Sequence, residues 1–170
     1  EELGDKSGIA KTLHQIAMIE QDRGNLDKAM ELYQKSLKIK EELGDKSGIS
    51  ATLHQLAMIE QDRGNLDKAM ELYQKSLKIK EELGDKSGIA LTMGALGTLL
   101  EQKGQTEEAF KHYLKAAYLF HQLNSPHEKQ ALKHMKRTAQ KLTPEKLNKT
   151  IKETPNEIKT YLKQITSQKP

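Results

Sequence analysis

The sequence is poor in the residues that build a large globular core, and it has no cysteine. Aromatic residues make up 4% of the chain and tryptophan is absent, which argues against a thick core packed around large rings. Without cysteine there are no disulfides, no thiol catalysis and no cysteine-based zinc site. This composition fits a reducing compartment, so we expect a cytoplasmic location. No apolar run approaches the roughly 20 residues that a membrane-spanning helix needs.

Proline is also absent before Pro126, which permits long uninterrupted helices over most of the chain. What the chain does contain is a repeat. The segment 8–43 returns 40 residues later as 48–83, and again in diverged form as 88–123. Residues 1–40 and 41–80 differ at only three positions. A fixed period with this fidelity indicates one supersecondary unit stacked on copies of itself.

Each copy predicts two helices joined by a short turn. In the first copy, apolar residues recur at helical spacing on both sides of Gly24, and a link of a few residues favours an antiparallel hairpin. Asn25 stands where it could cap the second helix, and Asp45 or Ser47 could cap the next one. The predicted buried positions are Ile9, Leu13, Ile16, Ala17 and Ile19 in the first helix, and Leu26, Ala29, Met30, Tyr33, Leu37 and Leu43 in the second.

The pattern of the copies resembles the tetratricopeptide repeat (TPR) family. That family has a large residue, then Leu-Gly or Leu-Ala, then Gly at the turn, then Ala, an aromatic and a small residue. The copies supply, in this order, Leu13, Ile16, Ala17, Gly24, Ala29, Tyr33 and Ser36; Leu53, Leu56, Ala57, Gly64, Ala69, Tyr73 and Ser76; and Met93, Leu96, Gly97, Gly104, Ala109, Tyr113 and Ala116. The departures are the missing first aromatic, Glu20 and Glu60 where the family often has tyrosine, and no proline closing the second helix.

The 40-residue period, longer than the usual repeat of about 34, matches the long-helix TPR variety with a GDKxGIA-type linker. The resemblance implies an all-α, right-handed superhelical solenoid of antiparallel helix pairs with a helical C-terminal cap. Ala29 is expected where the two helices of a pair approach most closely. Three repeat units are predicted at 1–40, 41–80 and 81–123. Because EELGDK at 1–6 recurs at 41–46 and 81–86, we also expect the chain to open inside a repeat.

Residues 124–170 differ in composition and predict a degenerate fourth unit followed by capping helices. Each expected helix start combines a hydroxyl residue with proline, at Ser125, Thr143 and Thr154. The predicted helices run roughly over 126–141, 144–153 and 155–166. The buried positions expected in them are Ala131, Leu132, Met135, Ala139 and Leu142, then Leu147 and Ile151, then Ile158, Tyr161, Leu162 and Ile165.

In TPR proteins the first helices of the pairs line a concave groove that holds a peptide or a helix. The resemblance places in this groove Lys11, His14, Met18, Gln21 and Asp22; Ala51, His54, Met58, Gln61 and Asp62; and Leu91, Gly94, Thr98, Glu101 and Gln102. Methionine beside histidine, glutamine and aspartate suits a partner helix with apolar anchors and polar contacts. The alternative is that these residues are solvated and remain alike because the copies are recent. The function implied is a non-catalytic scaffold for protein–protein interaction.

Other chemistry finds little support. Some TPR co-chaperones grip a C-terminal carboxylate with Asn and Lys or Arg, whereas this chain has Gln15 and Met18 at those places. His14 and His54 lie on successive units, about 8–10 Å apart at the least, too far to share an ion at bonds of about 2 Å. His127 and His134 are seven residues apart but lack a nearby carboxylate. No catalytic triad or phosphate loop stands out, so we expect no enzyme activity, cofactor or metal.

The charge is uneven along the chain. The first three 40-residue segments carry net charges of 0, −1 and −2, and residues 121–170 carry +7. A basic stripe could meet nucleic acid or an acidic surface, but the favoured interpretation is a solvated outer face of a capping helix. Its members are Lys129, Lys133, Lys136, Arg137 and Lys141.

A further hypothesis is self-association. The face of Ile9, Leu13 and Ile16 would be covered by a preceding unit in a longer array, and nearly identical units fit one another's surfaces. The alternative function is therefore a self-assembling or spacer array, which makes contact through its N-terminal end.

Overall fold

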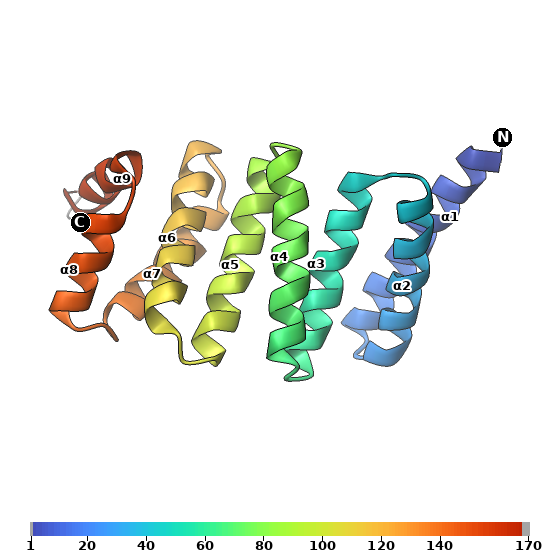
Figure 1. Ribbon diagram of the computed structural model, residues 1–170, viewed down its shortest axis with the longest axis horizontal. Helices are drawn as coiled ribbons and strands as arrows, with labels where there is room; N and C mark the ends of the chain where they lie inside the picture. Colours follow the sequence, from blue (N-terminus) through green and yellow to red (C-terminus); the bar gives the residue numbers. More distant parts are fainter. Residues whose placement is uncertain (1, 168–170) are drawn as a thin grey trace. The chain divides into compact units, whose positions relative to one another are not determined.

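The computed structural model describes the backbone of residues 2–167 and the side chains of residues 5–167. Over these residues the chain is all-α, with nine helices and no strand (Figure 1). It divides into two compact units, unit 1 (residues 1–85) and unit 2 (residues 86–170). The helices are α1 (Glu2–Asp22), α2 (Leu26–Glu42), α3 (Lys46–Asp62), α4 (Leu66–Glu82), α5 (Lys86–Gln102), α6 (Thr106–Gln122), α7 (His127–Ala139), α8 (Pro144–Glu153) and α9 (Asn156–Ser167).

Each unit is built from adjacent helix pairs. In unit 1, α1 packs on α2 and α3 packs on α4, and α2 also packs on α3. In unit 2, α5 packs on α6, and α6 also contacts α7, α8 and α9. The links within the pairs are short, at 23–25, 63–65 and 103–105, and such links return the chain antiparallel to itself. The all-α class and the pairing predicted for each copy are confirmed.

The turn inside each pair depends on a glycine in the left-handed region. Gly24 and Gly64 both have φ of +80°, and the next N–H, from Asn25, bonds the Glu20 carbonyl at 2.8 Å, as in a Schellman motif. Asn25 occupies the N-cap position of α2 but makes no side-chain cap bond. Its amide donates instead to Glu20 Oε2 at 2.7 Å. The predicted side-chain cap at Asn25 is wrong, because the carboxylate turns the amide away from the helix.

Glu20 and Glu60 are buried acids that tie these turns together. Besides the asparagine of the turn, Glu20 accepts from Lys28 Nζ at 3.2 Å, and Glu60 pairs with Lys68 Nζ at 2.6 Å. Hydrogen bonds from the asparagine and the lysine lower the pKa of Glu20. Burial alone would raise the pKa of Glu60, but the same two kinds of hydrogen bond outweigh it. The third copy has the buried Leu100 at this position.

The link between pairs in unit 1 is closed by a side-chain cap. Asp45 accepts the N–H of Gly48 at 2.9 Å at the start of α3, so the cap predicted there is confirmed. A Cβ on Gly48 would lie 2.8 Å from Lys40 Cδ and closer still to the Asp45 carboxylate. A larger residue at position 48 would displace the Asp45 carboxylate or the Lys40 stem.

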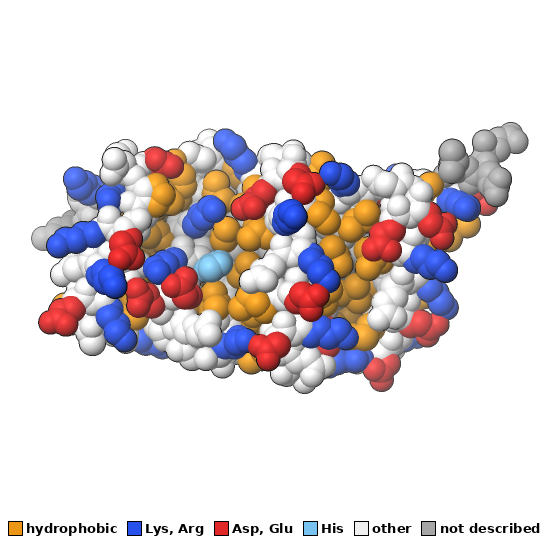
Figure 2. All heavy atoms as spheres, in the orientation of Figure 1, with side chains coloured by type: hydrophobic (Ala, Val, Ile, Leu, Met, Phe, Trp, Pro, Cys, Tyr) orange, Lys and Arg blue, Asp and Glu red, His pale blue; other side chains and the backbone are white. Residues whose placement is uncertain are grey.

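The core of unit 1 lies between α1, α2 and α3. Ala29 and Tyr33 are fully buried, and the Ser36 hydroxyl donates to the Ala10 carbonyl at 2.7 Å, so α1 and α2 run very close together here. In Figure 2, hydrophobic side chains reach the surface beside α2 and α3. The buried cluster is Ala17, Ala29, Tyr33, Leu56 and Ile59, bordered by Leu26, Met30, Leu32, Leu37 and Leu72.

The first copy begins differently from the others. The segment EELGDK forms the end of a helix and a turn at 41–46, where Gly44 has φ of +66° and the Asp45 N–H bonds the Lys40 carbonyl. At the start of the chain, residues 2–6 of the same segment are helical instead and form the beginning of α1.

The helices α7, α8 and α9 match the predicted ranges to within two residues. Thr143 caps α8 by accepting the N–H of Lys146 at 3.4 Å, as predicted. The cap expected at Thr154 is wrong, because its hydroxyl donates backwards to the Thr150 carbonyl at 2.9 Å. The Glu128 carboxylate in the first turn of α7 contacts two side chains outside its own helix. They are Tyr161 on α9 and His121 on α6, at 2.9 and 3.0 Å.

Burial in the C-terminal helices follows the prediction in part. Ala131, Met135, Ile158 and Tyr161 are buried, as expected. The other predicted positions are only partly buried: Leu132, Ala139, Leu142, Leu147, Ile151, Leu162 and Ile165. Thr138 and Thr150 are buried instead, because threonine satisfies its hydroxyl on the preceding helical turn.

Candidate functional site

In unit 1 the predicted groove positions include a histidine that is tied into the fold. His14 Nδ1 lies 3.2 Å from Thr52 Oγ1, which also accepts from Lys40 Nζ at 2.9 Å. Since the Thr52 hydroxyl donates to the Gly48 carbonyl at 2.8 Å, His14 must supply the proton from Nδ1. Burial, with a contribution from Lys40, lowers the pKa of His14 to about 4. A neutral His14 therefore links α1 to α3 and is only partly available to a partner.

The predicted glutamines are also engaged within their own pairs. Tyr33 donates its hydroxyl proton to Gln21 Oε1 at 2.9 Å, and Tyr73 does the same to Gln61 Oε1 at 3.0 Å. In the third copy Tyr113 donates to Glu101 Oε2 at 3.0 Å. These positions therefore accept the hydroxyl proton of the tyrosine in each pair and fix its side chain. The sequence pattern did not reveal this role.

The methionines of unit 1 are the positions most open to a partner. Met18 and Met58 are the large apolar side chains among the predicted groove positions of unit 1, and they are 42% and 37% exposed. The neighbouring predicted positions Lys11, Asp22, Ala51 and Asp62 are exposed as well. Flexible, polarizable methionines adapt to different apolar contacts, so α1 and α3 present an adaptable surface between charged residues.

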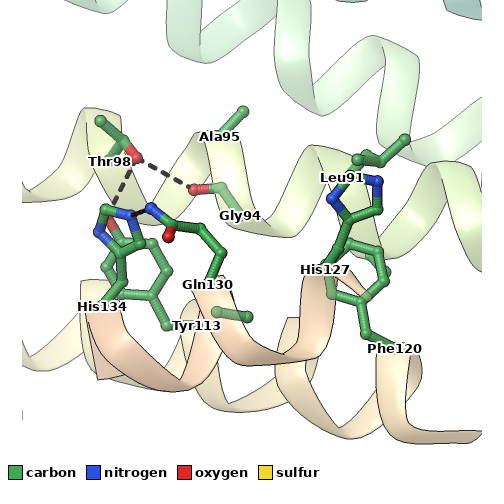
Figure 3. Close-up of a pocket in the computed structure, with 11 residues that line it drawn as sticks. Leu91, Gly94, Ala95, Thr98, Tyr113, Phe120, His127, Gln130 and His134 are labelled. Atoms are coloured by element: carbon green, nitrogen blue, oxygen red, sulfur yellow. Dashed lines mark hydrogen bonds between the residues drawn. The ribbon is translucent and has the colours of Figure 1, made fainter. Parts of the chain in front are cut away.

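In unit 2 the structure brings three predicted groove positions into one pocket. Leu91, Gly94 and Thr98 of α5 line a pocket of about 200 Å³. Figure 3 shows this pocket, with α7 supplying the opposite wall. Predicted Gln102 is exposed but does not line it. The remaining lining residues are Ala90, Ala95, Tyr113, Phe120, His127, Gln130, Ala131 and His134.

The polar end of the pocket is a connected set of side chains. Thr98 Oγ1 lies 3.0 Å from the Tyr113 hydroxyl, and the His134 ring stacks on the Tyr113 ring with centroids 5.0 Å apart (Figure 3). Gln130 Nε2 lies 2.7 Å from His134 Nε2, and Arg137 donates to His134 Nδ1 at 3.1 Å. Burial, then the Arg137 charge, lowers the pKa of His134, so its ring is neutral near pH 7.

From the sequence, His127 and His134 were candidates only for metal ligands. Their place in this pocket was not predicted. A signal was present in the repeat register, since His134 stands 40 residues after Gly94, at the position of His14 and His54. In the described part of the chain, no group of three or more His, Asp or Glu side chains is placed to hold a metal ion. Over the same residues, no helix is long and apolar enough to cross a membrane.

Part of the predicted basic stripe is not a free charged surface. Arg137 forms a short ion pair with Glu101, and Lys141 Nζ reaches the same carboxylate at 3.0 Å. Burial raises the pKa of Glu101, but the hydrogen bonds from Lys141, Arg137 and Tyr113 outweigh it and lower the pKa. The face in Figure 2 carries acidic and basic side chains in alternation, so no extended patch of one sign is visible there.

Comparisons with known proteins agree with this architecture. The tetratricopeptide repeat family model matches residues 8–82 and 48–119. No curated protein matches the sequence. Among solved structures, BtubC (BKLC) from P. vanneervenii is similar at 18% identity with a TM-score of 0.73, over 95% of this chain and 66% of that chain.

Two further solved structures are similar. The apo form of RapI is 18% identical with a TM-score of 0.75, over 79% of this chain and 49% of that chain. A Podosopora anserina putative kinesin light chain with nearly identical TPR-like repeats is 17% identical with a TM-score of 0.68, over 97% of this chain and 78% of that chain. At these identities the likeness shows the fold. The family match over most of the chain, carried by the paired helices described above, means that the chain belongs to the tetratricopeptide repeat family.

Proposed function

We propose that the chain is a non-catalytic scaffold that binds a peptide or amphipathic helix of another protein. Each unit has its own candidate surface, which is the exposed face of α1 and α3 in unit 1 and the exposed face of α5 in unit 2. The observation that carries this proposal is the pocket at Leu91, Gly94 and Thr98, where positions taken from the family's groove line one apolar hollow. The exposed Met18 and Met58 supply apolar contacts on the corresponding face of unit 1.

The experiment begins with peptides selected from a displayed random library on the whole chain. Their affinity is then measured for a variant with both Met18→Ser and Met58→Ser. Because both side chains are exposed, the variant should fold, and we expect affinity to fall at least about tenfold. The matched control replaces Lys35 and Lys75, exposed on α2 and α4, with serine and should bind as before. Equal losses in both variants, or none in either, would remove this surface as the site.

The second candidate function is self-association through α1. Ile9, Ile16 and Ile19 are 44%, 39% and 49% exposed, whereas Leu56 and Ile59, at the same register in α3, are buried against α2. The face of α1 is therefore chemically suited to a helix like α2 from a second copy. Sedimentation at increasing concentration tests this candidate: Ile16→Lys should abolish a dimer, and a monomer at all concentrations would exclude it.

A further inference from the structure

The pocket in unit 2 exists because two side chains present in the earlier copies are missing. The first and second copies carry His14 and His54 where the third has Gly94, and each is followed by glutamine where the third has Ala95. A Cβ built on Gly94 would meet nothing within 4 Å outside its own helix. The third copy thus has glycine and alanine where the first two have histidine and glutamine. Without the larger side chains, the face of α5 is left with a hollow.

The Tyr113 ring, which forms the floor of the pocket, is nevertheless held in place by a histidine from α7. In the first copy the His14 ring meets the edge of Tyr33, with centroids 5.0 Å apart. In the third, the ring of His134 from α7 stacks on Tyr113 at the same centroid distance. The histidine therefore supports the tyrosine ring without occupying the space above Gly94, as Figure 3 shows.

The size and lining of the pocket suit one apolar side chain. Leu91 stands at its rim and is 45% exposed, and Ala95, Phe120 and Ala131 add carbon surface. An apolar cavity of about 150 Å³ is enough to hold benzene, so the volume of about 200 Å³ accommodates a leucine or phenylalanine side chain. An exposed apolar rim of this kind is a common mark of an interaction site.

The charges beside the pocket favour an acidic neighbour for that side chain. The α7 residues that line the pocket, His127, Gln130, Ala131 and His134, include no acid. Arg137 does not line the pocket but contacts the lining residue His134. Glu101 is the carboxylate at this end, and it is shared by two cations, Arg137 and Lys141. Two cations on one carboxylate leave a positive excess at the mouth, and Arg137 is 52% exposed.

We propose that this pocket binds a leucine or phenylalanine of the partner segment, with a carboxylate next to it on that segment pairing with Arg137. The inference rests on the proposed function, since it identifies the chemistry of the partner at the surface of unit 2. Complementary charge fixes register and orientation more than affinity, so the apolar anchor supplies most of the binding and the carboxylate directs it.

The test uses short synthetic peptides with a central leucine flanked by glutamates, titrated into the whole chain with fluorescence anisotropy. Two comparison peptides replace the leucine with alanine, or the glutamates with lysines. We expect the leucine–glutamate peptide to bind at least about tenfold more tightly than either. Its amide chemical-shift changes should centre on Gly94, Ala95 and Thr98. Equal affinities for the leucine and alanine peptides would overturn the proposal. Amide chemical-shift changes that centre on other residues would also overturn it.

Matched variants separate pocket filling from damage to the fold. Gly94→Leu places a side chain in the open space and should lower affinity at least about tenfold, whereas Gly94→Ala should leave it within about twofold. Arg137→Gln should weaken the glutamate-flanked peptide and reduce its salt dependence, whereas Lys136→Gln on the same helix should not. Circular dichroism confirms that each variant remains helical. Equal affinities for the Gly94→Leu and Gly94→Ala variants would overturn the proposal.

The outcomes also distinguish this inference from the proposed function. If library-selected peptides lose affinity with Met18→Ser and Met58→Ser but not with Gly94→Leu, the scaffold function stands and the pocket proposal fails. If self-association is lost with Gly94→Leu, the occupant is a second copy of the chain and the peptide proposal fails. If selected peptides bind on α2 and α4, both proposals fail.

Discussion

At the scale of single residues, the departures from the family pattern have a physical explanation. Glu20 and Glu60 stand where an aromatic residue is common, and both are buried. Each is satisfied by the asparagine of the following turn and by a lysine in the next helix. Hydrogen bonds to an ionised carboxylate are shorter and stronger than those between neutral groups. In the first two copies, a hydrogen-bonded network of glutamate, asparagine and lysine therefore stands where the family often packs an aromatic side chain.

The Glu60 network predicts a pH-dependent stability. Glu60→Gln keeps the shape and removes the charge, so we expect a loss of about 1 kcal/mol in the free energy of unfolding at pH 7. Because the folded pKa of Glu60 lies below its ordinary value of 4.5, the contribution is present above that value and disappears as the pH falls through the folded pKa. Urea unfolding at pH 7 and pH 3.5 measures both effects.

The control for this prediction is Glu71→Gln. Glu71 forms an exposed pair with Lys75 one helical turn away, and such pairs contribute little. Its substitution should change the unfolding free energy by no more than about 0.5 kcal/mol. Equal losses for both variants would contradict the structural role given to Glu60.

His14 provides a second test at this scale. Its pKa is lowered to about 4 because the ring is partly buried and Lys40 lies nearby. The folded state therefore disfavours protonation, and His14 contributes stability that is complete above pH 6.5 and is lost as the pH falls from 6.5 towards 4. An NMR titration of the His14 ring should give a midpoint near 4. A midpoint at 6 or above would mean that the contact with Thr52 is not formed in solution.

At the scale of elements, two of the three glycines in α5 have opposite roles. Gly94 faces open space, whereas a Cβ on Gly97 would lie 2.7 Å from the Tyr113 ring. Ala17 and Ala57 occupy the equivalent position in the earlier copies, so Tyr113 sits closer to its partner helix than Tyr33 and Tyr73 can. Gly97 thus lets the Tyr113 ring lie close against α5, and Gly94 leaves the space above that ring open.

The same substitution at these two positions should act in opposite directions. Gly94→Ala should stabilise the chain by up to about 1 kcal/mol, the helix propensity difference between the two residues. Gly97→Ala gains the same propensity but forces the buried Tyr113 ring to move, so it should be less stable than wild type. Thermal unfolding followed by circular dichroism measures the difference. A gain of similar size at both positions would contradict the close contact described at Gly97.

The C-terminal helix α9 has two buried side chains, Ile158 and Tyr161. Tyr161 is buried, and its hydroxyl donates to Glu128 at 2.9 Å, while its ring lies 4.9 Å from that of His121. Tyr161→Phe keeps the ring but leaves the carboxylate without this donor, so we expect faster hydrogen exchange over residues 156–167. Gln164→Ala, on the exposed side of α9, is the control. Unchanged exchange in the Tyr161 variant would show that the hydroxyl does not hold α9.

At the scale of the whole molecule, the repeat made the fold predictable. Helix pairing, the glycine turns and the buried Ala29 and Tyr33 follow from a pattern that recurs three times. The pocket was less predictable, because it depends on α7, which lies outside the copies with the strongest pattern. Gly94 and Thr98 were named as groove positions, but beyond the 40-residue register of His134 nothing in the sequence indicates that His127, Gln130 and His134 face them. The Glu101 network was missed for the same reason, since its cations lie 36 and 40 residues away.

The most direct test of the account is a crystal structure of the whole chain with a peptide selected from the displayed library. We predict a peptide on the face of α1 and α3 that carries Met18 and Met58 in unit 1, or on the face of α5 that carries Leu91 in unit 2, where one apolar side chain lies above Gly94. A peptide seated on the opposite faces, against α2, α4 and α6, would contradict it.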